Sequence, residues 1–276
     1  MSDAGSVPVS VVIPCFRCAK SIVGAVESIE QQSIKPAEVI LVDDSSGDDT
    51  LVILQNIASK HAGWIKIVEL KKNMGAGSAR NAGWGAASQP YIAFLDADDS
   101  WHPEKLSIQY EYMRNNPEIS LCGHSCIQLN YSDTLPVIQK RPFIKKLSAK
   151  NLLFKSPFST TSSIMLKREI AFRFKEGKRY SEDLLLWQKI AFSGLQIARM
   201  ESPLAYFHKP LYGAVGLSAQ LWKMEKGELE NLNALRKENN ISYWLFSAAY
   251  AFSAIKFVKR LVVTMIKRLA NLVFHR

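Results

Sequence analysis

Three carboxylates stand close together at Asp96, Asp98 and Asp99, directly after the apolar run Tyr91 to Leu95. This run has the length and the aromatic and branched residues of a buried strand. In an extended chain, residues two apart project to the same side, so we expect Asp96 and Asp98 to face one ligand and Asp99 to face elsewhere. Two carboxylates at a strand end suit Mg²⁺ or Mn²⁺, which complete their shell with water and substrate phosphates. The pattern therefore predicts a divalent metal site.

A structural explanation for part of this stretch is a helix start. Ser100 followed by Pro103 and Glu104 is a typical N-terminal signal, and we expect Ser100 to cap the helix that follows. That role leaves Asp96 and Asp98 unexplained, so the metal interpretation is preferred.

The elements before this stretch alternate between apolar runs and helical patterns. Expected strands are Val9 to Pro14, Glu38 to Val42, Ile65 to Leu70 and Tyr91 to Leu95, and helical patterns follow the first three at 19–31, 52–57 and 78–87. This alternation predicts an α/β fold with a Rossmann-like, mostly parallel sheet flanked by helices. The polar residues that follow the strands are Arg17, Asp43, Asp44, Lys72, Asn73, Asp96 and Asp98. Because ligands bind at the carboxyl ends of the strands in such a sheet, we expect these side chains to meet along one edge.

Beyond Trp101 the pattern is less regular. A helix is expected at 103–115 and strands at 119–129 and 162–166, with a basic surface loop at 130–150 between them. Another helical pattern covers 184–191, and Glu182 and Asp183 stand in its first turn. On the residues alone these two are expected to be capping acids, which the helix dipole favours.

The last third of the chain is helical and basic. The formal net charge of +10 suggests an anionic partner, and no acid occurs after Glu238. The uncharged run from Tyr243 to Ile255 is too short to span a bilayer, which needs about 20 residues. A basic amphipathic helix with aromatic residues is typical of one that lies on an anionic membrane surface. A packed terminal helix or an oligomer contact is the alternative.

Two cysteine pairs, Cys15 with Cys18 and Cys122 with Cys126, invite a zinc or redox interpretation. Their spacings differ and neither pair has the glycines of a metal-binding turn, so ordinary reduced cysteines of a cytosolic protein are expected. The N-terminus shows no basic segment before an apolar run, so no secretory signal is expected.

Five segments resemble, in order and approximate spacing, the motifs of the inverting family 2 glycosyltransferases with the GT-A fold, of the kind that builds bacterial surface glycans. They are VSVVIPCF at 9–16, VDDSS at 42–46, NMGAGSARN at 73–81, LDADD at 95–99 and SED at 181–183. The resemblance covers about residues 7 to 220. It departs from the family at Arg17, where the family has Asn after the Pro-x-Phe start.

The resemblance implies roles for these residues. Asp43 or Asp44 would hydrogen-bond the base or ribose of a nucleotide sugar. Asp96 and Asp98 form an Asp-x-Asp motif for Mn²⁺ or Mg²⁺, with Asp98 the better metal ligand. Asp183 matches the catalytic base of the family, which reverses the capping interpretation. The other implied contacts are Pro14 and Phe16 beside the base, Asn73, Arg80 and Asp96 near the nucleotide or phosphates, Glu182 orienting the base or acceptor, and His208 at the diphosphate or metal.

The resemblance also implies an organisation and a function. We expect a catalytic domain at 1–220, with a nucleotide-binding half at about 7–115 and an acceptor half at about 116–220, followed by a basic helical tail at 221–276. The expected reaction moves a sugar from a nucleotide diphosphate, UDP above all, to a hydroxyl of a lipid-linked or lipopolysaccharide (O-antigen) type of glycan. The expected place is the cytoplasm, peripherally on the inner face of a bacterial membrane.

Other classes of protein fit less well. A basic peripheral-membrane protein without catalysis is the non-enzyme alternative. A nucleotidyltransferase that forms nucleotide sugars needs a glycine-rich phosphate loop near its start, and residues 13–20 have no glycine. An Asp-x-Asp phosphatase carries its motif after the first strand, not the fourth. Nucleic acid is disfavoured as a partner because the positive charge concentrates in a tail with an apolar face.

Overall fold

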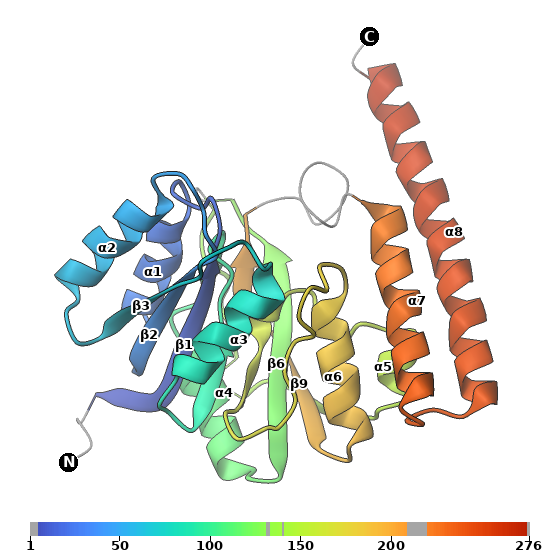
Figure 1. Cartoon of the computed structure of the whole chain (residues 1–276), viewed down its shortest axis with the longest axis horizontal. Coiled ribbons are helices and arrows are strands. Elements are labelled where there is room, and N and C mark those ends of the chain that lie inside the picture. Colours follow the sequence, from blue (N-terminus) through green and yellow to red (C-terminus); the bar gives the residue numbers. More distant parts are fainter. Residues whose placement is uncertain (1–4, 131–132, 140, 209–219, 275–276) are drawn as a thin grey trace.

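The computed structural model describes residues 5–130, 133–139, 141–208 and 220–274, with side chains as far as Thr264 (Figure 1). Within these ranges nine strands form one sheet, in which eight follow the order β3-β2-β1-β4-β8-β6-β9-β5 and β7 pairs with β9. The predicted α/β class with a sheet flanked by helices is confirmed. The segment at 209–219, which includes part of the expected acceptor half, lies outside the described residues.

The first half of the sheet is parallel. β1 (Ser6–Cys15) pairs with β2 (Lys35–Asp43) and β4 (Tyr91–Phe94), and β2 pairs with β3 (Ile65–Glu69). The helices α1 (Ile22–Glu30), α2 (Thr50–Lys60) and α3 (Ala76–Ala86) connect these strands. β1 and β2 are buried on both faces, which is why their sequences are continuous apolar runs and not alternating ones. These four strands were predicted correctly.

The second half of the sheet is mixed. β8 (Met165–Lys167) runs antiparallel to β4 and to β6 (Ile119–Gln128), and β6 runs parallel to β9 (Gln196–Phe207). The short strands β5 (Asp99–Trp101) and β7 (Ile144–Leu147) both pair antiparallel with β9. β9 is thus the strand on which the second half is built, and it was not predicted.

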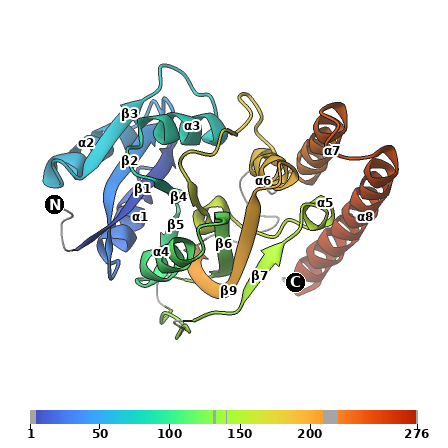
Figure 2. The same cartoon turned by 90° about the horizontal axis from the view of Figure 1, so that it is seen from below.

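Helices cover both faces of the sheet. Figure 2 shows α3 and α6 (Glu182–Phe192) on one side and α1 and α4 (Lys105–Asn115) on the other. The two faces correspond to two core clusters, one including Val11, Ile22 and Leu106 and the other including Val12, Trp84 and Trp187. The sheet therefore lies at the centre and its strand ends are left to form the site.

Three local expectations were wrong. Ser100 does not cap a helix, because it lies within β5, whose residues pair with β9, and α4 begins only at Lys105. The segment expected to be a basic loop at 130–150 contains β7. The strand expected at 162–166 is instead the 3₁₀ turn η1 (Thr161–Ser163) followed by β8. In each case pairing across the sheet outweighs the local signal.

The C-terminal part is a helical hairpin of α7 (Leu221–Lys237) and α8 (Tyr243–Phe274), which lie side by side in Figure 1. α8 also packs on the short helix α5 (Asn151–Phe154), where Phe252 meets Phe154. Lys256 and Arg260 of α8 form ion pairs with Glu225 and Glu228 of α7. Among the described residues, no helix has both the length and the apolar character needed to cross a bilayer.

Candidate active site

A cleft of about 540 Å³ opens at the carboxyl ends of the parallel strands. It is lined by eight of the eleven residues to which the family resemblance assigns a role, namely Pro14, Phe16, Asp44, Asn73, Arg80, Asp96, Asp98 and Glu182. Segments up to 168 residues apart along the chain therefore meet in one place, Pro14 at the end of β1 and Glu182 at the start of α6. Asp43, Asp183 and His208 are not among the lining residues.

Asp44 is fixed by the loop that precedes α3. Its two carboxylate oxygens accept the backbone N–H groups of Met74 and Gly75, each at 2.7 Å. The amide of Asn73 donates to the carbonyl oxygen of Asp44 at 3.3 Å. Gly75 has φ of 87°, a left-handed backbone conformation that favours glycine, so the shape of this loop depends on a glycine at this position. Asp44 is thus held rigidly at the wall of the cleft.

Asp43 is turned away from the cleft toward its own turn. Its carboxylate accepts the hydroxyl and the backbone N–H of Ser46. Ser46 in turn accepts the N–H of Arg17 at 3.1 Å, and Arg17 has φ of 50°, the left-handed region in which Asn is more common than Arg. Of the two acids that were candidates for the base or ribose, Asp44 is therefore the one that lines the cleft, and Asp43 shapes the loop beside it.

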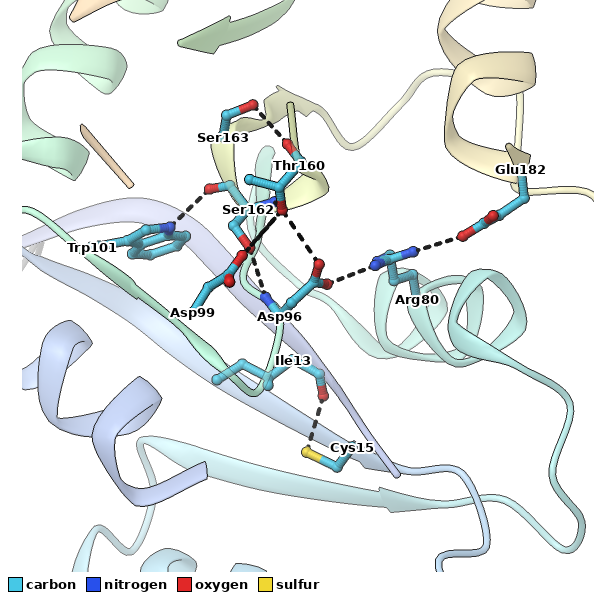
Figure 3. A network of polar contacts seen from close by, with 10 residues as sticks. All are labelled: Ile13, Cys15, Arg80, Asp96, Asp99, Trp101, Thr160, Ser162, Ser163 and Glu182. Atoms are coloured by element: carbon cyan, nitrogen blue, oxygen red, sulfur yellow. Dashed lines mark hydrogen bonds and ion pairs between the residues drawn. The ribbon is translucent and has the colours of Figure 1, made fainter. Parts of the chain in front are cut away.

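Arg80 connects two carboxylates across the cleft. Its Nη2 lies 2.6 Å from Asp96 Oδ1 and its Nη1 lies 3.2 Å from Glu182 Oε1 (Figure 3). Burial alone would lower the pKa of this guanidinium, but the charges of Asp96 and Glu182 raise the pKa above its usual value. Arg80 therefore stays charged and holds the Asp96 turn and the start of α6 together.

Asp96 and Asp98 face the cleft and Asp99 does not, as predicted, but the cause is a turn and not an extended strand. The N–H of Asp99 donates to the carbonyl of Asp96 at 3.0 Å, which reverses the chain. Asp96 and Asp98 line the cleft, whereas Asp99 is buried and its carboxylate accepts the hydroxyls of Ser162 at 2.6 Å and Thr160 at 3.1 Å. Burial, followed by the charge of Asp96, raises the pKa of Asp99 to about 8.

Thr160 and Ser162, which bind Asp99, also support Asp96. The hydroxyl of Ser162 accepts the N–H of Asp96 at 3.0 Å, and Thr160 lies 3.4 Å from Asp96 Oδ2 (Figure 3). Trp101 donates its indole N–H to the carbonyl of Ser162 at 2.8 Å. The Asp-x-Asp turn is therefore buttressed from η1 by hydroxyls that sequence reasoning did not single out.

A divalent ion fits this arrangement. The described residues contain no group of three or more His, Cys, Asp or Glu side chains assembled as metal ligands. Mg²⁺ and Mn²⁺ are commonly bound by one or two carboxylates and complete their shell from water and substrate phosphates, so Asp96 and Asp98 at the cleft wall are a sufficient protein contribution. That Asp98 makes the more direct contact with the ion stays a prediction from the sequence.

Glu182 and Asp183 begin α6 as expected. Burial, together with the neighbouring Asp183, raises the pKa of Glu182 to about 7, and Arg80 opposes this shift. Burial also raises the pKa of Asp183, whose Oδ1 accepts the N–H of Leu184 at 2.7 Å. The preceding Ser181 has φ of 53° and its hydroxyl makes no capping bond to the helix. A carboxyl with a pKa of about 7, such as Glu182, is suited to proton transfer near neutral pH, and Asp183 stands next to it.

His208 lies at the end of β9, beside β5. Its Nδ1 lies 2.8 Å from the carbonyl of Leu129, and its Nε2 lies 2.8 Å from the hydroxyl of Ser100. A carbonyl only accepts, so Nδ1 carries a hydrogen and donates it to Leu129. The metal or diphosphate role of His208 stays a prediction.

The family follows from comparison with known proteins. The family model described as glycosyl transferase family 2 matches residues 10–173, more than half of the chain. The chain belongs to this family of glycosyltransferases. Among curated relatives, a putative teichuronic acid biosynthesis glycosyltransferase (TuaG) of Bacillus subtilis is 31% identical over 90% of this chain and 96% of its own. An amylovoran biosynthesis glycosyltransferase (AmsB) of Erwinia amylovora is 30% identical over 72% of this chain and 69% of its own.

Solved structures confirm the GT-A fold of this glycosyltransferase. A fragment of TarS from S. aureus, in complex with UDP-GlcNAc, superposes with a TM-score of 0.62 and 20% identity, over 81% of this chain and 66% of that one. A mannosyltransferase (PcManGT) of Pyrobaculum calidifontis, in complex with GDP-Man and Mn²⁺, gives a TM-score of 0.64 at 17% identity, over 98% of this chain and 81% of its own. The chain thus spans slightly less than two thirds of the TarS fragment.

The cleft of this glycosyltransferase also contains two cations that sequence reasoning missed. Lys178 and Arg179 line it from the segment before α6. Arg179 donates to Asn73 Oδ1 at 2.7 Å, which joins this segment to the loop before α3. The available signal was the position of a Lys-Arg pair just before the Ser-Glu-Asp motif, but nothing local distinguishes these cations from the other basic surface residues.

The cysteines are free thiols in the structure. Cys15 and Cys18 are buried at the cleft wall, and Cys122 and Cys126 belong to β6. Burial raises the pKa of Cys122 and of Cys126 to about 12, so these two are inert neutral thiols at neutral pH.

Proposed function

We propose that this glycosyltransferase is an inverting, metal-dependent enzyme that moves a sugar from a nucleotide diphosphate, UDP, to a hydroxyl of a glycan acceptor. The observation that carries the proposal is the convergence of Asp44, Arg80, Asp96, Asp98 and Glu182 on one cleft. Asp44 suits the base or ribose of a nucleotide sugar, and Arg80 together with Asp96 and Asp98 suits a diphosphate and its metal ion.

Each side of the cleft has a task in this proposal. Asp44 accepts from the base or ribose, since each of its oxygens keeps a lone pair beyond the bond to Met74 or Gly75. Pro14 and Phe16 flank the base. Arg80 and Asn73 lie toward the phosphates. A bound Mn²⁺ or Mg²⁺, held by Asp98 and Asp96, supplies Lewis-acid stabilisation of the departing diphosphate.

Transfer is a single displacement. The acceptor oxygen forms a bond to the anomeric carbon while the bond from that carbon to the phosphate oxygen breaks, and the electron pair leaves with the diphosphate. Asp183 takes the proton of the acceptor hydroxyl as general base. Glu182, held by Arg80 at 3.2 Å, orients the base or the acceptor. No protein nucleophile is required.

Known proteins support the nature of the donor and acceptor. A UDP-Glc glucosyltransferase (WfaP) of Escherichia coli, whose name gives a GlcNAc-diphosphoundecaprenol acceptor, is 40% identical over 38% of this chain and 41% of its own. TuaG and AmsB are named for surface polysaccharides. A lipid-linked or lipopolysaccharide-type acceptor at the cytoplasmic face of a bacterial membrane is therefore our proposal for this chain.

The exposed apolar residues of the C-terminal hairpin support a membrane location, but two of its basic residues do not. Lys256 and Arg260 are paired with acids of α7, so these two charges are not directed to lipid as the sequence suggested. On the opposite face Trp244, Ile255 and Val258 are 82%, 68% and 58% exposed. An exposed apolar face in a basic helix suits the interface of an anionic membrane, and we propose that α8 uses this face.

The test of the function is a screen of nucleotide sugars with Mn²⁺ and with Mg²⁺. A bound donor raises the apparent melting temperature by mass action, so the correct donor should raise it in the presence of the ion and to a smaller extent with EDTA. Slow metal-dependent hydrolysis of the same donor is expected in the absence of acceptor. A chain that neither binds nor hydrolyses any UDP-, GDP- or dTDP-sugar would exclude the proposal.

A further inference from the structure

Helix α7 touches the segment that leads into the catalytic pair. The side-chain amide of Asn231 donates to the carbonyl oxygen of Ser181 at 2.8 Å. Asn231 is buried, with 1% of its surface exposed. The hydroxyl of Ser181 faces the carbonyl of Met224, also on α7, at 3.5 Å. The residue before Glu182 is therefore held by the helical hairpin and not by the sheet.

Ser181 needs this support because of its backbone. With φ of 53° it lies in the left-handed region, which is unfavourable for a residue other than Gly, Asn or Asp. Its carbonyl oxygen also accepts the N–H of Leu185 at 3.2 Å, so the same oxygen starts the hydrogen bonding of α6. The bond from Asn231 thus fixes the peptide from which the helix with Glu182 and Asp183 begins.

The approach of α7 is unusually close at Gly227. A Cβ built on Gly227 would lie 2.6 Å from the carbonyl oxygen of Tyr180, closer than a carbon atom can come without a shift of the backbone. Lys178 donates to the carbonyl of Gly227 at 3.1 Å and pairs with Glu230 at 3.2 Å. Contacts from 178 to 181 therefore run along one face of α7.

Helix α8 fixes α7 in turn. The hydroxyl of Ser253 donates to the buried Glu225 at 2.8 Å, and Arg260 contacts Glu225 and Glu228 at 3.3 and 3.0 Å. Leu232 and Leu235 of α7 pack in a small core with Ala249 of α8, which also includes Leu153 of α5 and Phe192 of α6. The hairpin is thus packed together and also contacts α5 and α6.

We propose that α7 is a positioning element of the active site and that Asn231 is its positioning residue. It sets the place of Glu182 and Asp183 relative to Arg80, which holds Glu182 from the cleft side. The proposal rests on the proposed function for the role of Asp183. The donor contact at Asp44 is held by Met74 and Gly75, on another element. Loss of the Asn231 bond should therefore affect the rate of transfer and not the binding of the donor.

The experiment compares Asn231→Asp with the wild type in the full-length protein. The substitution keeps the shape of the side chain and replaces the donor by an oxygen that faces the carbonyl of Ser181. We expect kcat to fall about 10- to 100-fold, the range of a misplacement of about 1 Å, while the KM for the donor stays within about twofold. Gly227→Ala must push α7 away from Tyr180. It should also lower kcat while the KM for the donor stays nearly unchanged.

Met113→Ala on α4 is the matched control, because it opens a cavity in the core on the other face of the sheet without touching α7 or Ser181. It should lower the melting temperature and leave kcat unchanged at a temperature where the protein is folded. Wild-type kcat in folded Asn231→Asp and Gly227→Ala, or a kcat loss in Met113→Ala of equal size, overturns the proposal. A rise in donor KM in step with the fall in kcat overturns it as well.

Hydrogen exchange separates this proposal from the proposed function. In Asn231→Asp the amide of Leu185 should exchange about tenfold faster, whereas the amides of Met74 and Gly75 at the donor wall should not change. If the wild type transfers no sugar and this exchange pattern is still seen, the function is wrong and the positioning contact stands. Unchanged exchange at Leu185 excludes the contact itself.

Discussion

Arg80 Nη2 lies 2.6 Å from Asp96 Oδ1, so a buried guanidinium on α3 is bonded to the turn that offers the candidate metal ligands. The same guanidinium reaches Glu182 at 3.2 Å. One side chain thus joins three parts of the site that are separate in the sequence, namely α3, the Asp-x-Asp turn and the start of α6.

Removal of the Arg80 guanidinium should lower the stability of the protein. Arg80→Met leaves Asp96 and Glu182 as partly buried carboxylates without their counterion, and we expect the free energy of unfolding to fall by about 3–5 kcal/mol. Urea unfolding at pH 7 measures it. Arg114→Met on the exposed face of α4 is the control and should change the free energy by less than about 0.5 kcal/mol. Equal stability of the two variants would contradict the ionic bridge.

Asp183→Asn tests the base. Loss of a general base typically lowers kcat about 10²- to 10⁴-fold, and we expect a fall in this range with donor affinity nearly intact, because Asp183 does not line the cleft. Steady-state transfer and donor titration measure the two quantities. Asp133→Asn, at an exposed position, should keep wild-type kcat. Equal loss of donor binding and transfer would refute the assignment of Asp183.

The metal role of Asp98 has a readout that does not depend on transfer. Calorimetric titration with UDP in the presence of Mn²⁺ should show binding weaker by on the order of tenfold in Asp98→Asn, which is about 1.4 kcal/mol. EDTA should weaken binding to the wild type by a similar factor and have little effect on the variant. The exposed Asp49→Asn is the control. Full activity of the wild type in excess EDTA would exclude the metal.

Glu182 should make stability depend on pH. Burial raises its pKa from 4.5 to about 7, so the folded state binds this proton more tightly than the unfolded chain does. Its contribution is present below about pH 4.5 and is lost as the pH rises through about 7, at a cost of up to about 3 kcal/mol. Relative to Glu182→Gln, the wild type should therefore lose stability between pH 5 and 8, as measured by urea unfolding. Parallel pH profiles would argue against the shift.

The exposed face of α8 predicts membrane binding. The full-length protein should pellet with vesicles of phosphatidylglycerol and much less with vesicles of phosphatidylcholine. The double variant Ile255→Glu, Val258→Glu places charges on this face without touching the pairs with α7 and should stay in the supernatant. Val52→Glu, an equally exposed position on α2, should pellet like the wild type. Wild-type pelleting of the double variant would exclude this face.

The parallel half of the fold was predictable because its signals are local. Strands such as β1 are buried on both faces and therefore read as apolar runs, and the rule for parallel sheets brings Asp44, Asp96 and the end of β1 to one edge. The choice between Asp43 and Asp44 was not predictable, since it depends on the bonds to Ser46 and to Met74, which come from different loops.

The mixed half could not be derived in the same way. β5 exists because Ser100 and its neighbours pair with β9, about 106 residues further along the chain. The local sequence Ser-Trp-His-Pro gives no sign of this pairing. The supporting residues Thr160, Ser162, Arg179 and Asn231 act through single contacts with distant segments. Such residues have ordinary types and no periodic pattern, so only coordinates reveal them.

Helix α3 lies very close to the sheet, since a Cβ on Gly83 would meet Val12 at 2.4 Å, and its leading loop is bonded to Asp44. The helix therefore has little freedom to slide, and it carries Arg80 on its second turn. One rigid helix would therefore contact both the nucleoside and the diphosphate of a donor. A substitution at position 44 that is meant to change the preferred base should consequently also shift Arg80 and lower the rate of transfer. Second substitutions at 73–75, in the loop that joins Asp44 to α3, are the ones to test for recovery of that rate.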